Sequence, residues 1–292
     1  MPLVDTATAS LADRLQRFPA VCVVTSDGAV DYRQAGLGTQ AVTHVLLHGI
    51  GSGSASWLRQ LEAAELSGHA RVLAWEAPGY GRSSPVMPLQ PTAGDYAIRL
   101  WSWLDSLGIR HPVTLVGHSL GALMATRAAV QRPDQAAKLV LLAPAQGYAR
   151  ASPEDRTDKL TTRLANLRTL GAQGMAQKRG AAMLSPQADP ELVAYVQSVM
   201  AQVHPDGYTQ ACHLLSTGDL LTDLVKVSCP VMVASGLADA ITPAAGCQQV
   251  AAAAGVPWTD LGNAGHACAL DAPEQVNALL GLVGQTRSGA VA

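Results

Sequence analysis

Short apolar segments alternate with amphipathic segments along most of this chain, and this alternation constrains the fold more than any other feature of the sequence. Short apolar runs bounded by Gly or Pro are typical of strands that are buried on both faces. We predict such strands at residues 43–48, 71–75, 112–117, 138–143 and 230–235. Helical patterns between them predict helices at 56–67, 93–107, 120–132, 244–254 and 273–284. The alternation predicts an α/β fold, with a mostly parallel sheet covered by helices on both faces.

Two regions depart from this alternation. Residues 21–34 contain the turn pair Asp27-Gly28 between two strand-like segments, which predicts an antiparallel hairpin at the start of the sheet. Residues 146–215 show helical patterns with no strand between them, and we interpret them as an inserted helical cap, or lid. The predicted core is then made of residues 1–145 and 216–292.

One strand and the following helix flank the motif Gly117-His118-Ser119-Leu120-Gly121. A Gly-x-Ser-x-Gly sequence between strand and helix is typical of a strained turn that exposes a nucleophilic serine. Gly117 and Gly121 lack the Cβ atoms that would clash where strand and helix cross. The helix N-terminus favours negative charge, so Ser119 is the candidate nucleophile.

A serine nucleophile needs a base and an acid that orients the base, and in this architecture they follow in the order Ser, Asp, His. Asp239 lies just beyond the predicted strand at 230–235, and His266 follows the short apolar run 256–258. Both therefore lie in loops at the carboxyl edge of the predicted sheet, where sites of open α/β folds collect. We predict a triad of Ser119, Asp239 and His266.

The loop 48–54 is rich in glycine and follows the predicted strand at 43–48. Its backbone can approach Ser119 closely, and we assign the two oxyanion donors to the N–H groups of Ile50 and Leu120, with Gly51 as the alternative to Ile50. The loop lacks the third glycine of a dinucleotide-binding motif, and the Gly-Lys-Ser/Thr of a phosphate-binding loop is absent. A nucleotide site is excluded.

Charge and composition exclude several other classes of protein. The net charge is −2 and no basic cluster is present, which argues against nucleic acid as a partner. No apolar run approaches the roughly 20 residues of a membrane-spanning helix. The first residues show no secretory signal, so we expect a cytoplasmic protein. The five cysteines have irregular spacings without a Cys-x-x-Cys pair, which suits neither a disulfide framework nor a zinc site. We expect no metal and no organic cofactor.

These motifs together resemble the α/β-hydrolase superfamily, in particular its capped bacterial esterase, lactonase and C–C hydrolase branch. The resemblance covers nearly all of residues 20–285 and rests on motifs in family order: His48-Gly49, residues 77–83, the motif around Ser119, the turn at Asp239, and Asn263-Ala264-Gly265-His266. It implies an eight-stranded sheet. It also implies that Ser119 is the nucleophile, His266 the general base and then acid, and Asp239 the residue that orients the imidazole.

The predicted function is hydrolysis of a carboxylic ester, thioester or lactone through an acyl-enzyme, with a small molecule as the substrate. The same triad could serve an acyltransferase, a perhydrolase or a C–C bond hydrolase, although C–C hydrolases usually have Asn where His118 precedes the serine. A non-catalytic ligand-binding protein on a hydrolase scaffold is an alternative from another class. The sequence leaves the substrate and the oligomeric state open.

The predicted cap carries an excess of positive charge between residues 150 and 180. This segment contains seven cationic side chains and three acidic ones. They could steer an anionic substrate, but we favour a solvated helix face, because long charged side chains usually lie outside. For the pocket we expect the aliphatic side chains of Ile50, Leu120, Met87 and Ile241, with flexible methionines from the cap: Met175, Met183 and Met200.

Overall fold

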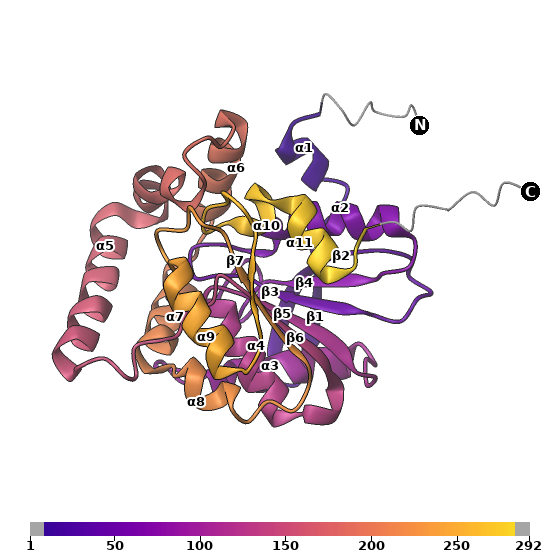
Figure 1. Ribbon diagram of the computed structural model, residues 1–292, viewed down its shortest axis with the longest axis horizontal. Helices are drawn as coiled ribbons and strands as arrows, with labels where there is room; N and C mark the ends of the chain where they lie inside the picture. The colour runs from indigo at the N-terminus through magenta and orange to yellow at the C-terminus, as the bar shows by residue number, and fades with distance from the viewer. Residues whose placement is uncertain (1–8, 284–292) are drawn as a thin grey trace, which may run out of the picture.

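The computed structural model describes residues 9–283, in which strands and helices alternate largely as the sequence predicts (Figure 1). The strands are β1 (Val21–Thr25), β2 (Gly28–Ala35), β3 (His44–Leu47), β4 (Val72–Trp75), β5 (Val113–His118), β6 (Ala136–Leu142), β7 (Val231–Ser235) and β8 (Trp258–Asp260). The α-helices are α1 (Leu11–Leu15), α2 (Leu58–Ser67), α3 (Ala93–Ser106), α4 (Leu120–Gln131), α5 (Pro153–Arg179), α6 (Pro190–Met200), α7 (Pro205–Thr217), α8 (Leu220–Leu224), α9 (Ala244–Ala253), α10 (Cys268–Asp271) and α11 (Pro273–Leu280). Three short 3-10 helices complete the list: η1 (Ser54–Trp57), η2 (Pro133–Gln135) and η3 (Ala181–Met183).

The last helix ends earlier than the sequence predicts. We expected it over 273–284, but α11 ends at Leu280 because Gly281 adopts the left-handed conformation, with φ 67°. A glycine in this conformation is a common helix terminator, because it has no Cβ to oppose the positive φ. Residue 284 itself lies outside the described residues.

The eight strands form one sheet in the order β1-β2-β4-β3-β5-β6-β7-β8. β1 and β2 form the predicted antiparallel hairpin, and β2 pairs with β4 in the antiparallel sense. All the other neighbours are parallel. The mostly parallel eight-stranded sheet is therefore confirmed.

Two apolar cores cover the two faces of the sheet. Because side chains alternate along a strand, Val45 and Leu47 of β3 enter one core and Leu46 enters the other. α3 and α4 pack into the first core, and α2 and α11 into the second. Figure 1 shows these two pairs of helices on opposite sides of the strands. Packing on both faces of the sheet fixes the positions of the carboxyl ends of the parallel strands.

The chain between β6 and β7 contains α5, η3, α6, α7 and α8, and no strand. α5 lies at the far side of the molecule from β1 (Figure 1). Its helical path is broken at Gly171, where φ is 61° and ψ is 179°. Essentially only glycine adopts this backbone conformation, so the residue produces a kink that a sequence periodicity does not reveal. Within residues 9–283, none of the helices is long and apolar enough to span a bilayer.

Candidate active site

Ser119 occupies the strained turn that the sequence predicts between β5 and α4. Its φ is 53° and its ψ is −116°, a combination that a residue with a side chain rarely adopts. The strain is held by the backbone: the Ser119 N–H donates to the Leu142 carbonyl, 3.0 Å, and the Ser119 carbonyl accepts from the Ala122 and Ala145 N–H groups. Such strain persists only where surrounding structure fixes it, as happens at many active sites.

The glycines of the motif permit close packing around this turn. A Cβ at Gly121 would lie 2.2 Å from the Leu47 carbonyl oxygen, and one at Gly117 would lie 2.5 Å from the Gly121 carbonyl oxygen. Both distances are far shorter than any real contact, and both involve backbone atoms that cannot move aside. The geometry confirms the predicted reason for glycine at both positions.

Asp239 and His266 form a buried pair at the same edge of the sheet. His266 Nδ1 donates to Asp239 Oδ2 at 2.9 Å, and only 4% of Asp239 and 2% of His266 are exposed. Asp239 Oδ1 accepts from the N–H groups of Ile241 and Thr242, at 2.8 and 2.9 Å. Burial raises the pKa of Asp239, but its hydrogen bonds with His266 and Thr242 outweigh that effect and lower the pKa below 3.8. Asp239 is therefore an anion that fixes the orientation of the imidazole.

Thr242 also contacts this pair, although we assigned it no role from the sequence. Its Oγ1 donates to Asp239 Oδ2 at 2.7 Å and lies 3.1 Å from His266 Nδ1 and 3.0 Å from the Ala143 carbonyl. The available signal was its spacing, since a residue three positions after an aspartate can close a local turn onto it. Thr242 is a positioning residue for Asp239 and, through it, for His266.

We expect Thr242→Val to lower kcat for the predicted ester hydrolysis about tenfold, since a hydrogen bond to a charged group contributes about 1.5 kcal/mol or more. KM should stay within about twofold, because the backbone N–H groups still hold Asp239 and the side chain keeps its volume. Thr242→Ser, which keeps the hydroxyl, should recover most of the loss. Steady-state kinetics on the three proteins check this; a drop in kcat that Thr242→Ser shares would contradict it.

The two predicted oxyanion donors lie beside Ser119. Ile50 and Leu120 both line the cavity that Ser119 faces, and Leu120 is the first residue of α4. In the part of the chain that the structure describes, neither amide N–H donates to another residue. Both are therefore available to an incoming oxygen atom.

His48 holds the loop that carries Ile50. Its Nδ1 donates to the Gly49 carbonyl at 2.8 Å, and its Nε2 accepts from the Ala77 N–H at 2.9 Å. The Gly49 carbonyl and the Ile50 N–H belong to one trans peptide and point in opposite directions. Tyr80 fixes the next peptide by donating its hydroxyl to the Ile50 carbonyl at 2.7 Å. The peptide planes on both sides of Ile50 are therefore fixed by side chains.

His118 supports the loop of His266. Its Nε2 donates to the His266 carbonyl at 2.7 Å, and the two rings lie 4.9 Å apart. Burial lowers the pKa of His118 to about 3, and that of His48 to about 4, because a charged imidazole would lose its hydration. Both rings are neutral near pH 7, which suits the hydrogen bonds they make.

These two histidines predict that acid destabilises the fold. Each imidazole has a pKa of 6.5 in the unfolded chain and a pKa near 3 to 4 in the folded chain. At pH values between these two, the unfolded chain binds protons that the folded chain does not. The free energy of unfolding therefore rises with pH across this window, by about 1.4 kcal/mol per pH unit for each group. His118→Gln keeps an N–H donor and should reduce the slope between pH 5 and pH 6 by about that amount.

Urea denaturation at several pH values measures these slopes. The exposed His204→Gln serves as the control for the loss of an imidazole outside the core. An unchanged slope in His118→Gln would show that this imidazole is not the source of the acid sensitivity.

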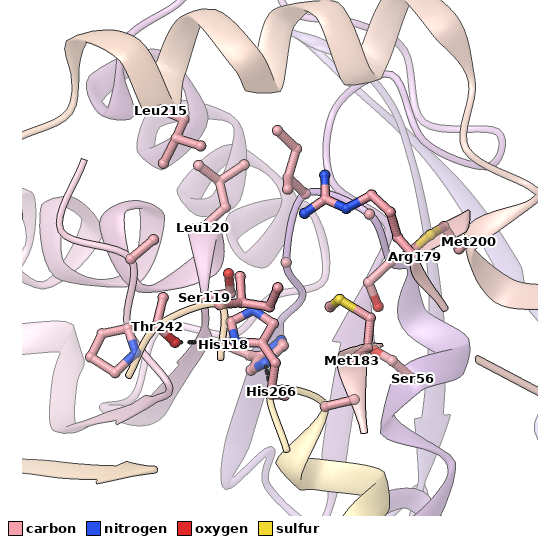
Figure 2. Close-up of a pocket in the computed structure, with 18 of the residues that line it drawn as sticks. Ser56, His118, Ser119, Leu120, Arg179, Met183, Met200, Leu215, Thr242 and His266 are labelled. Atoms are coloured by element: carbon pink, nitrogen blue, oxygen red, sulfur yellow. Dashed lines mark hydrogen bonds between the residues drawn. The ribbon is translucent and has the colours of Figure 1, made fainter. Parts of the chain in front are cut away.

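A cavity of about 360 Å³ adjoins Ser119 and His266 (Figure 2). Ile50, Leu120 and Ile241 line it as expected, and so do the three predicted methionines: Met175, Met183 and Met200. The expectation for Met87 is wrong. It precedes α3 in a surface loop and is 90% exposed. Aromatic contacts come from tryptophan and tyrosine, namely Trp57, Tyr148 and Tyr208.

The cap charges are not all on a solvated face. Arg150, Lys159, Arg168 and Lys178 are exposed as expected, but Arg163 and Arg179 are partly buried and line the cavity. Within residues 9–283, no group of three or more His, Cys, Asp or Glu side chains is arranged to hold a metal ion.

Comparisons with known proteins identify the family of this chain and several relatives. The model of the alpha/beta hydrolase family matches residues 45–279. The pimeloyl-[acyl-carrier protein] methyl ester esterase of Vibrio cholerae is 31% identical, over 68% of this chain and 77% of its own. The (E)-2-((N-methylformamido)methylene)succinate hydrolase of Acinetobacter baylyi is 29% identical over 80% and 86%. An esterase from Thermogutta terrifontis has the same fold, with a TM-score of 0.78, 23% identity and coverage of 90% and 96%. This chain belongs to the alpha/beta hydrolase family.

Proposed function

We propose that this protein is a serine hydrolase that cleaves a carboxylic ester, thioester or lactone through an acyl-enzyme on Ser119. One observation carries the proposal: the strained Ser119 shares a cavity with two unpaired amides and with His266, whose imidazole is hydrogen-bonded to the buried Asp239. The relatives support the same class, since one is named as a methyl ester esterase and another as a hydrolase.

The acylation step follows from these positions. His266 Nδ1 keeps its proton, which it donates in a hydrogen bond to Asp239. His266 Nε2 is therefore free to accept the proton of Ser119 Oγ as that oxygen forms a bond to the substrate carbonyl carbon. The carbonyl oxygen gains negative charge and accepts hydrogen bonds from the Ile50 and Leu120 amides. The C–O or C–S bond then breaks, and the leaving group takes the proton from His266.

Deacylation repeats the same two steps, with water as the nucleophile in place of Ser119. His266 takes a proton from a water molecule, whose oxygen bonds to the acyl carbon, and Ser119 leaves with the proton that His266 returns. The route uses only the three side chains, two backbone amides and water.

A panel of p-nitrophenyl acetate, butyrate and octanoate, with a lactone and a thioester, tests the proposal. We expect saturable hydrolysis of at least one member and, with excess methanol present, mainly the free acid as product. A methyl ester as the main product would instead identify an acyltransferase. The absence of any turnover, together with no labelling by a fluorophosphonate, would favour a ligand-binding protein.

A further inference from the structure

Two arginines of one helix face the cavity that contains Ser119. Arg163 and Arg179 both belong to α5 and both line this cavity, whereas no aspartate or glutamate of the described residues does so. Figure 2 shows the Arg179 guanidinium directed across the cavity toward the side where Leu120 and Ser119 lie. The cavity therefore has a net positive lining.

The kink at Gly171 is what brings the two arginines together. In a straight helix, side chains sixteen positions apart would be separated by about 24 Å along the axis and would point in nearly opposite directions. Gly171, with φ 61° and ψ 179°, lies between them and interrupts the helix. Essentially only glycine allows this backbone conformation. The break that it produces in α5 lets both guanidinium groups reach the same cavity.

Neither arginine has an acidic partner among the described residues. By contrast, Arg150 pairs with Asp219 at 2.9 Å, and Arg127 pairs with Asp223 at 2.9 Å. Arg163 instead donates to the Tyr148 hydroxyl at 3.2 Å, and no ion pair forms at Arg179 within residues 9–283. Partly buried charges without counterions are costly unless an anion neutralises them.

The surroundings favour a planar anion. Tyr148 accepts from Arg163, so its own proton is free to donate, and Tyr208 adds a second hydroxyl to the same cavity. Lys159 Nζ lies over the Tyr148 ring, 5.2 Å from its centre, and adds positive charge. A guanidinium binds a carboxylate with two parallel hydrogen bonds, and it stays charged at any pH that the protein experiences.

We propose that Arg163 and Arg179 form a carboxylate-binding subsite, so that the substrate carries a free carboxylate in addition to the scissile ester. This inference rests on the proposed function and names its substrate class. Hydrolysis of such an ester releases a dicarboxylate if the free carboxylate is on the acyl part, or a hydroxy carboxylate if it is on the alcohol part. The two arginines, by holding this carboxylate, orient the scissile carbonyl toward Ser119.

Two pairs of matched esters test the subsite. Monomethyl adipate and the methyl ester of adipamic acid differ only in an acyl-side carboxylate or amide. 4-Acetoxybutanoate and 4-acetoxybutanamide place the same difference on the alcohol side. We expect the wild type to prefer the anion in at least one pair by about tenfold or more in kcat/KM.

Arg163→Gln and Arg179→Gln should each remove most of that preference, because each lowers kcat/KM for the anionic ester far more than for its neutral counterpart. Arg168→Gln is the control, because Arg168 is an exposed arginine of the same helix. Equal rates on both members of both pairs, with no effect of either cavity variant, would overturn the proposal.

A binding measurement separates this proposal from the proposed function. Adipate should bind the Ser119→Ala variant, as followed by calorimetry or by the intrinsic tryptophan fluorescence, to which Trp57 in the cavity lining contributes. The added Arg179→Gln substitution should weaken that binding about tenfold or more, whether or not any ester is turned over. If adipate binds equally well with and without Arg179, the subsite is excluded even where ester hydrolysis is established.

Discussion

Replacement of Ser119 by alanine should lower kcat/KM for p-nitrophenyl butyrate by at least about 10⁴-fold, because no other group in the proposed route can form the acyl-enzyme. Alanine removes only the hydroxyl, so the backbone turn at φ 53° faces no greater steric strain than before. Circular dichroism and the urea midpoint should therefore match the wild type. Stopped-flow or steady-state absorbance of nitrophenolate measures the loss.

Ser198→Ala is the matched control. Ser198 lies on α6, and its hydroxyl donates to the Tyr195 carbonyl at 2.7 Å, away from the cavity lining. Its kcat/KM should stay within about twofold of the wild type. If Ser119→Ala retained more than about a tenth of the activity, Ser119 would not be the nucleophile.

The substitution Asp239→Asn should lower kcat by about 10³- to 10⁴-fold with little change in KM. The shape of the side chain is kept, but the amide can no longer offer two acceptor oxygens. Asp239 now accepts from His266 on Oδ2 and from two backbone N–H groups on Oδ1. An asparagine that keeps the backbone contacts presents its NH₂ group to His266, which selects the wrong imidazole tautomer and withdraws the charge that stabilises the imidazolium.

Asp260→Asn controls for the loss of an acidic side chain near the same loop. Asp260 is exposed and accepts from the Gly262 N–H at 2.8 Å, so its replacement should change kcat less than about twofold. Steady-state kinetics on both variants give the comparison. Similar kcat values for Asp239→Asn and the wild type would show that Asp239 is a structural acid only.

The parts of the site that follow regular rules were accessible from the sequence. The apolar runs around Val45 and Leu115 predict buried parallel strands, because only such strands are apolar on both faces. Once the strands are placed, their carboxyl ends bring Ser119, Asp239 and His266 to one edge of the sheet. The close contacts of Gly117 and Gly121 were likewise predictable, since a strand and helix that cross at a tight turn leave no space for a Cβ.

The parts that depend on long-range geometry were not accessible. The kink at Gly171 breaks the periodicity of α5 by a choice of backbone angles, and glycine in a helical pattern does not specify them. Without that kink, Arg163 and Arg179 would count as two charges on a long solvated helix. Thr242 was missed for a different reason. Its contact with Asp239 is local, and the only signal was a spacing of three residues, which does not by itself show that the turn forms.

The most direct test of the account is the mass of the intact protein after reaction with a fluorophosphonate, followed by peptide mapping. We predict one adduct per chain, located on Ser119, with loss of ester hydrolysis in proportion to the labelled fraction. The adduct should form much more slowly in Asp239→Asn, because the serine loses its oriented base. An ester-hydrolysing protein that gives no adduct, or carries it on another residue, would contradict the assignment of Ser119 as the nucleophile.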